Sequence, residues 1–296
     1  MSPVLLRLDL GGTEFVLGSY STFYALAWIA GLALGVAVAA WRGLPWRRVL
    51  AVYGLALAAG IVGARVFDLG IAGAFYAEDP SRIWRASFQG FSLYGGLAVA
   101  SVVAIVLARV WRMPVWRLAD SSVPGIALGV VLMRVGCFLR GCCFGVPSDV
   151  PWAVTYPPGS HAWTHQFLEG RTGILAAFGH VEPVHPTQLY ELLAAVLLAG
   201  LAVWLMRRSR VADGAPFLAF ALGFTLFRLG NGYLRVRQPV ITAPEWFYPV
   251  FYVVVIVVLV ALLVDRIRTG GSRASGDAHA APPARTEPCP KRHTDR

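Results

Sequence analysis

The chain has 296 residues, of which 57% are hydrophobic and only 14% charged, and its mean hydropathy is +0.61. This composition excludes an ordinary soluble domain and indicates a polytopic membrane protein. The net charge of +10 comes almost wholly from arginine, since Lys291 is the only lysine. The arginines lie in short loops beside apolar runs, which favours contact with anionic lipid and argues against nucleic acid as a partner.

Seven apolar segments are each close to the roughly 20 residues that a helix needs to cross a bilayer. In chain order they are residues 20–40, 49–70, 92–110, 118–139, 186–206, 215–234 and 246–264. The sequence therefore predicts an all-α polytopic membrane protein with about seven transmembrane helices, spanning residues 1–268. The tail at residues 269–296 is rich in Gly, Ala, Pro and charge, so we expect it to be disordered.

Arginines cluster after the first, third, fifth and seventh predicted spans. These loops contain Arg42, Arg47, Arg48, Arg109, Arg112, Arg117, Arg207, Arg208, Arg210, Arg266, Arg268 and Arg273. All four loops fall on one side, which the positive-inside rule assigns to the cytoplasm. We therefore expect an extracytoplasmic amino terminus and a cytoplasmic carboxyl terminus. Residues 141–184, between the fourth and fifth spans, are then expected to form a small extracytoplasmic head.

The segment 134–145 places two arginines and three cysteines at the outer end of the fourth span. An ionisable residue at membrane depth is expensive and usually faces a protein interior or a wet cavity. Guanidinium is also well shaped to hold a phosphate by two-point contact. Arg134 therefore indicates a phospholipid-headgroup site, whereas Arg140, nearer the helix end, could simply reach the interface.

Three further motifs carry polar groups at span ends. In residues 90–97, Gly95 and Gly96 allow close approach of a ligand or a neighbouring helix, and Tyr94 adds a phenol. Residues 185–191 read His-Pro-Thr-Gln-Leu-Tyr-Glu, a polar helix start in which Glu191 suits the helix dipole and capping is the simpler alternative.

The third of these motifs, residues 227–239, places Arg228, Asn231 and Arg235 on one helical face. Arg228 is deep in its span, as Arg134 is.

For Cys137, Cys142 and Cys143, elsewhere in the chain, a disulfide, a metal site and a lipid-carrying thiol are alternatives, but packing around a lipid slot is favoured. We accordingly expect no metal and no cofactor.

These motifs together resemble the bacterial prolipoprotein diacylglyceryl transferases. The resemblance extends over nearly the whole chain before the tail and includes Phe23-Tyr24 and the strings at 92–97, 134–145, 185–191 and 227–239. It implies a seven-helix protein of the bacterial inner membrane with a periplasmic head between the fourth and fifth helices. It also implies a transferase of lipoprotein biosynthesis that needs no cofactor.

The implied reaction moves a diacylglyceryl group from phosphatidylglycerol to the lipobox cysteine of a prolipoprotein signal peptide. The partners would be phosphatidylglycerol, the prolipoprotein and membrane lipid. The resemblance assigns catalytic roles to Arg228, Tyr94 and Tyr24. It assigns headgroup binding to Arg134, Gly136, Cys137, Gly145 and Arg235, and supporting roles to Gly95, Gly96, His185, Gln188, Tyr190 and Glu191. A transferase with another acceptor and a non-catalytic phospholipid-binding relative are the alternatives.

The chain departs from the family pattern at several polar positions. Tyr94 replaces the usual histidine, Cys137 and Arg140 replace two asparagines, and Cys142 and Gly232 replace two glutamates. The departures indicate a divergent branch that keeps the phosphate-binding arginines.

The arginine pattern predicts the outcome of a labelling experiment. In a cysteine-free background, a cysteine placed in residues 207–210 should resist a membrane-impermeant maleimide in intact cells, whereas one placed in residues 141–184 should react. Labelling of the 207–210 loop from outside the cell would contradict the predicted orientation.

Overall fold

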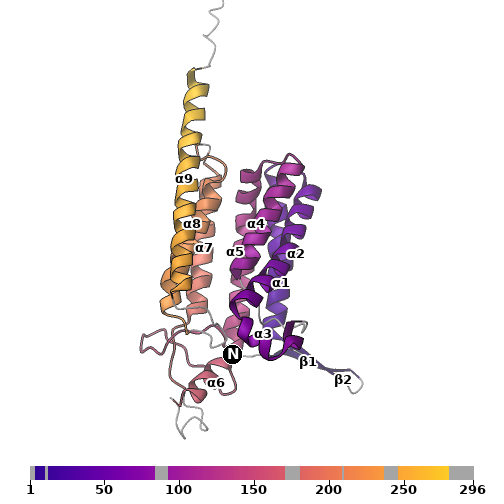
Figure 1. Ribbon diagram of the computed structural model, residues 1–296, viewed down its shortest axis with the longest axis vertical. Helices are drawn as coiled ribbons and strands as arrows, with labels where there is room; N and C mark the ends of the chain where they lie inside the picture. Colours follow the sequence, from indigo (N-terminus) through magenta and orange to yellow (C-terminus); the bar gives the residue numbers. More distant parts are fainter. Residues whose placement is uncertain are drawn as a thin grey trace, which may run out of the picture.

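A computed structural model describes residues 4–10, 13–83, 93–170, 181–208, 210–236 and 246–279, and it shows long helices standing side by side (Figure 1). The long helices are α1 (Ser19–Trp41), α2 (Trp46–Ile71), α4 (Leu93–Val110), α5 (Val115–Arg140), α7 (Thr187–Met206), α8 (Ala215–Tyr233) and α9 (Phe247–His279). The short elements are β1 (Val4–Leu10), β2 (Thr13–Gly18), α3 (Gly73–Glu78), η1 (Pro80–Ile83) and α6 (His161–Leu168).

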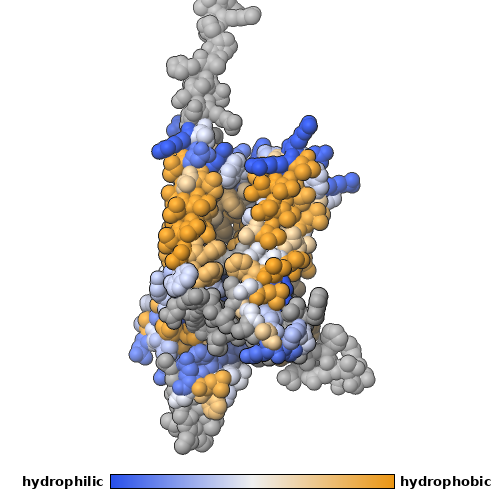
Figure 2. Space-filling view, viewed as in Figure 1, coloured by the Kyte–Doolittle hydropathy of each residue, from blue (hydrophilic) through white to orange (hydrophobic). Residues whose placement is uncertain are grey.

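Each of the seven predicted apolar segments corresponds to one long helix, which confirms a polytopic, mainly helical membrane protein. Among the described residues, five helices are long and apolar enough to cross a membrane, namely α1, α2, α5, α7 and α9, and α4 contains a shorter apolar stretch. Hydrophobic residues form a broad band over the middle of the helices, with hydrophilic residues beyond both ends of the band (Figure 2). Helix α9 continues to His279, past the predicted end of the last span, and residues 280–296 of the predicted tail lie outside the described residues.

A hairpin of β1 and β2, which was not predicted, precedes α1. The two strands pair antiparallel with Leu10 opposite Thr13, so Gly11 and Gly12 connect them. Residues 6–10 alternate apolar and charged side chains, and a glycine pair between two such runs is a strong hairpin signal. The assignment of an all-α fold is corrected to this extent.

The long helices pack as a row in which neighbours follow the order α4, α2, α1, α5, α7, α8 and α9. Glycines bring the backbones of α1 and α5 close together. A methyl group added to Gly31 would lie 2.8 Å from the carbonyl oxygen of Gly125. Small residues at such crossings let helices approach in a membrane, where lipid tails offer no hydrophobic drive for association. Helix α5 therefore sits between α1 on one side and α7 on the other.

The arginine-rich loops meet at one end of the bundle, as the sequence predicts. Arg42 donates to the carbonyl oxygen of Arg117 (3.1 Å) and pairs with Asp213 (2.9 Å). The buried Asp120 accepts from the backbone N–H groups of Gly214 (2.8 Å) and Phe217 (2.9 Å), and so satisfies donors in the first turn of α8. These contacts join the loops after α1 and α7 to the first turns of α5.

A small folded segment lies at the opposite end, between α5 and α7, where the head is predicted. It contains α6, and its core is built from Phe144, Tyr156, Ala162 and Val184. Val154 pairs its backbone with Val184 in both directions, at 3.0 and 3.1 Å. The segment therefore has an interior of its own, and it lies at the base of the molecule in Figure 1.

The close crossing of α1 and α5 generates a stability prediction. Replacement of Gly125 by alanine should destabilise the protein by about 1–3 kcal/mol, because the added methyl group meets the backbone of α1. The matched control is Gly200→Ala in α7, where nothing lies within 4 Å and alanine favours the helix. Thermal unfolding in detergent measures both variants, and an equal effect at the two positions would contradict the packing argument.

Candidate functional site

The carboxylate of Glu191 accepts hydrogen bonds from two arginines that come from different helices. Its Oε1 lies 2.7 Å from Nη2 of Arg134 in α5 and 2.6 Å from Nη1 of Arg228 in α8. Glu191 itself belongs to α7 and is 2% exposed. A buried charge is tolerable only when it is paired and hydrogen-bonded, so this cluster fixes how α5, α7 and α8 meet.

Arg134 keeps binding capacity beyond this ion pair. The side chain is buried, and among the described residues its Nε has no hydrogen-bond partner. Its Nη1 lies 3.8 Å from Sγ of Cys137. A guanidinium presents its N–H groups as a planar fork that suits carboxylate and phosphate oxygens. The Nε of Arg134 is therefore a donor that the ion pair with Glu191 leaves unused.

Arg228 connects the cluster to the last helix. Its Nε donates to the hydroxyl oxygen of Tyr252 in α9 at 3.3 Å. Tyr252 was not among the predicted site residues, because it lies within an apolar run and carries no polar pattern. The only signal was its hydroxyl, a group that usually finds a partner when the residue is buried.

The first turn of α7 holds the chain that leaves α5. Gln188 donates from Nε2 to the carbonyl oxygen of Cys142 (2.7 Å) and to the hydroxyl of Tyr156 (3.0 Å). Thr187 donates its hydroxyl to the carbonyl oxygen of Cys143 at 2.7 Å. These bonds lie just outside the Glu191 cluster and fix the head against the bundle.

Two other predicted residues, His185 and Tyr190, belong to a separate polar chain. Nδ1 of His185 lies 3.1 Å from the hydroxyl of Tyr190, which accepts from Nε1 of Trp152 at 2.6 Å. These contacts link the start of α7 to the head. The structure thus separates these two residues from the arginine cluster, although they share a motif with Glu191.

Gly145 and Arg235 lie beside each other. Their backbones form an isolated antiparallel bridge, and Gly145 donates its N–H to the carbonyl oxygen of His185 at 2.9 Å. A methyl group added to Gly145 would lie 2.6 Å from the carbonyl oxygen of Leu234, so only glycine fits. Both residues line a cavity of about 300 Å³ on the head side of the bundle, together with His165.

Tyr24 and Gly136 lie where α1 meets the half of α5 that leads into the head. The half-buried Tyr24 stacks on Tyr20, with ring centroids 5.8 Å apart, and meets Trp28 edge-on. A methyl group on Gly136 would lie 2.9 Å from Cβ of Phe23. Gly136 is therefore placed as a packing residue of the helix crossing.

Arg140 binds the head and so has a role beyond reaching the interface. Its Nε donates to Nε2 of His161 at 3.0 Å, and its guanidinium lies over the ring of Tyr20. Burial and the Arg140 charge lower the pKa of His161, which keeps this imidazole neutral and able to accept the bond.

Gly95 and Gly96 face α2. Methyl groups there would lie 2.7 Å from the carbonyl oxygen of Gly63 and 3.1 Å from that of Gly60, so the helix-packing alternative describes both positions. Tyr94 is the second residue of α4, and its side chain lies outside the described residues.

Three cysteines gather beside Arg134. The sulfur atoms of Cys137, Cys142 and Cys143 lie within 4.8 Å of one another. The other two thiols and the charges of Arg235 and Arg134 hold the pKa of Cys143 well below its usual value. These residues stood out in the sequence, but the convergence of all three thiols was not predicted.

Comparison with known proteins shows similarity over most of the chain. The family model described as prolipoprotein diacylglyceryl transferase matches residues 7–265. Three similar proteins are each named phosphatidylglycerol–prolipoprotein diacylglyceryl transferase. The one from Ruegeria pomeroyi is 31% identical over 253 residues, covering 79% of this chain and 80% of that protein. The one from Dehalococcoides mccartyi strain BAV1 is 26% identical, covering 89% of this chain and 96% of that protein. The one from Synechococcus elongatus is 27% identical, covering 71% of this chain and 70% of that protein.

The shared carboxylate predicts a large loss of stability when it is neutralised. Glu191→Gln should cost about 3–5 kcal/mol, because it leaves two guanidinium groups without their buried partner. The control is Asp213→Asn, which removes an arginine partner whose side chain is 49% exposed and should cost less than about 1 kcal/mol. Thermal unfolding in detergent compares the two, and similar losses would show that the Glu191 pairing does not organise the bundle.

Proposed function

Because the chain belongs to the prolipoprotein diacylglyceryl transferase family, we propose that it transfers diacylglyceryl from phosphatidylglycerol to the lipobox cysteine of a prolipoprotein. One observation carries the proposal most strongly, namely the convergence of Arg134 and Arg228 on Glu191. A pair of fixed guanidinium groups at the end of a helical bundle suits a lipid phosphate, and among the described residues the buried Nε of Arg134 has no partner of its own.

The chemistry requires charge stabilisation on the leaving group. The acceptor thiolate would attack the glyceryl carbon that carries the phosphate, a carbon–sulfur bond would form, and glycerol phosphate would leave with the electron pair of the broken carbon–oxygen bond. Arg134 and Arg228 would stabilise the charge that develops on that phosphate. Glu191 would act as a positioning residue, because it holds both guanidinium groups in fixed orientations.

Other residues would support the same step. Tyr252 would orient Arg228, and Tyr24 would line the outer part of α1 near the head. Tyr94 would donate a hydrogen bond where the family usually has histidine. Gly145 and Arg235 would form the part of the headgroup site that borders the cavity.

The proposed arrangement in the membrane has seven crossings and an extracytoplasmic amino terminus in the bacterial inner membrane. This arrangement is supported by the different composition of the two ends of the helical bundle. Arginine-rich loops meet at one end, and the head, which contains α6, lies toward the other (Figure 1). Glu191 is the fifth residue of α7, the helix that follows the head. The active end would then face the compartment in which a prolipoprotein presents its lipobox.

Transfer to a different acceptor is a second candidate. The observation that favours it is the thiol cluster beside Arg134, in which Cys137 and Cys142 stand where the family pattern has polar side chains. Donor binding would be the same in both reactions, so the two candidates differ only in the acceptor.

Transfer of labelled diacylglyceryl from phosphatidylglycerol to a lipobox peptide tests the proposal. Arg134→Ala and Arg228→Ala should each lower the rate by at least about 10²-fold, since each removes donors from the developing phosphate charge. Lysine at either position should restore little, because the planar fork is lost. The control is Arg208→Ala. Arg208 follows α7 and stacks on the ring of Trp204, so its replacement should leave the transfer rate unchanged.

The outcomes separate the candidates. Full activity in both alanine variants would contradict the headgroup assignment. Hydrolysis or transfer from labelled phosphatidylglycerol without peptide labelling would favour another acceptor. Binding of the lipid with no turnover under any condition would favour a non-catalytic relative.

A further inference from the structure

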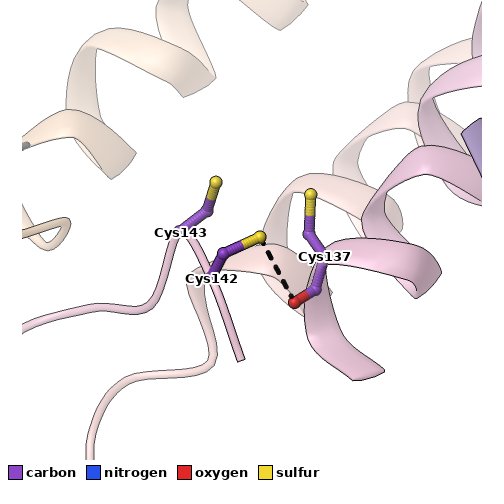
Figure 3. Close-up of side chains that lie close together, drawn as sticks. All are labelled: Cys137, Cys142 and Cys143. Atoms are coloured by element: carbon purple, nitrogen blue, oxygen red, sulfur yellow. Dashed lines mark hydrogen bonds between the residues drawn. The ribbon is translucent and has the colours of Figure 1, made fainter. Parts of the chain in front are cut away.

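The thiol cluster, defined as Cys137, Cys142 and Cys143, has the arrangement of a ligand set. The three sulfur atoms lie within 4.8 Å of one another, and the side chains enter a common space (Figure 3). Cys137 is buried, and the other two are half-buried. Among the described residues, no histidine or carboxylate joins the group.

The end of α5 explains why the first two thiols meet. Cys142 donates its N–H to the carbonyl oxygen of Cys137 at 3.1 Å, and Gly141 donates to that of Phe138 at 3.2 Å. Gly141 has φ of 74°, so the helix ends in a Schellman motif. In this motif the side chains five residues apart come into contact, which here are Cys137 and Cys142.

The third thiol is brought in by an unusual backbone conformation. Cys143 has φ of 63°, in the left-handed region that non-glycine residues rarely adopt. Such a conformation costs on the order of 1–3 kcal/mol and persists when its surroundings hold it, often at functional sites. Thr187 and Gln188 hold it here, through bonds to the carbonyl oxygens of Cys143 and Cys142.

The spacing suits a soft metal ion. With metal–sulfur distances of about 2.3 Å, a trigonal three-sulfur site places the sulfur atoms about 4 Å apart. The cluster would need to contract by less than about 1 Å to reach that spacing. Thiolates select Cu(I), zinc and iron–sulfur clusters, and zinc prefers a fourth ligand that the described residues do not supply here.

The charge of a loaded site would be partly offset by a neighbouring cation. Three thiolates around a monovalent ion carry two negative charges. The buried guanidinium of Arg134 lies against the cluster, with Nη1 3.8 Å from Sγ of Cys137. A disulfide would use only two of the sulfur atoms, and the neighbouring Cys142 and Cys143 bond awkwardly with each other.

We propose that Cys137, Cys142 and Cys143 bind one Cu(I) ion through three thiolates. This site goes beyond the transferase reaction and replaces the expectation that the thiols only fill space around a lipid. Binding exchanges the thiol protons for the metal ion and involves no change in oxidation state.

Reduced full-length protein in detergent, carrying Cys289→Ser, is the sample for the test, since this change removes the remaining cysteine. Cu(I) is supplied in competition with the chromogenic chelator bicinchoninate. One Cu(I) per chain should bind, with three sulfur neighbours in X-ray absorption. Cys137→Ser, Cys142→Ser and Cys143→Ser should each weaken binding by more than the roughly 10- to 100-fold that follows loss of an outer-shell group.

A second measurement covers variants that fail to fold. In the unsubstituted chain, Cu(I) should protect the three clustered cysteines from iodoacetamide while Cys289 still reacts, as read by mass spectrometry. Binding no tighter than in the triple serine variant would overturn the proposal, as would a two-sulfur copper site. A disulfide within the cluster that resists reduction would overturn it as well.

Discussion

A carboxylate buried at the end of a helical bundle must have cationic partners, and the arrangement of α5, α7 and α8 follows from that requirement. Glu191 alone in α7 would be costly, and the deep arginines Arg134 and Arg228 would be costly in α5 and α8. Their shared contact makes three polar side chains tolerable in one place. Tyr252 extends the network to α9, so four helices meet around one carboxylate.

The start of α7 positions both the charges and the head. Thr187 and Gln188 hold the turn after α5 from outside, and Glu191, about one helical turn further along, holds the arginines. A rigid helix end thus fixes the spacing between the turn that carries Cys142 and Cys143 and the guanidinium of Arg134. That spacing keeps the sulfur atoms, the guanidinium of Arg134 and the head in one region.

The positions of the helices could be predicted from sequence because length and apolar composition decide them. Arg134 and Arg228 could be recognised as site residues because a charged side chain within an apolar span is energetically costly and usually functional. The role of Glu191 could not be recognised from sequence. A glutamate that interacts with its helix dipole and one that pairs with arginines of two other helices have the same sequence pattern. Tyr252 gave no signal within its apolar run. The hairpin before α1 did give a sequence signal, namely alternating apolar and charged residues followed by a glycine pair. This signal was overlooked beside the much stronger hydrophobic pattern of the spans.

The Schellman turn that ends α5 has an evolutionary consequence. All three thiols and the glycine that turns the chain lie within residues 137–143, so the cluster is encoded in one short stretch. Its gain or loss in a lineage needs only a few substitutions there and leaves the helix crossings at Gly31 and Gly95 untouched. A site of this kind can come and go among related chains while the bundle around it stays the same.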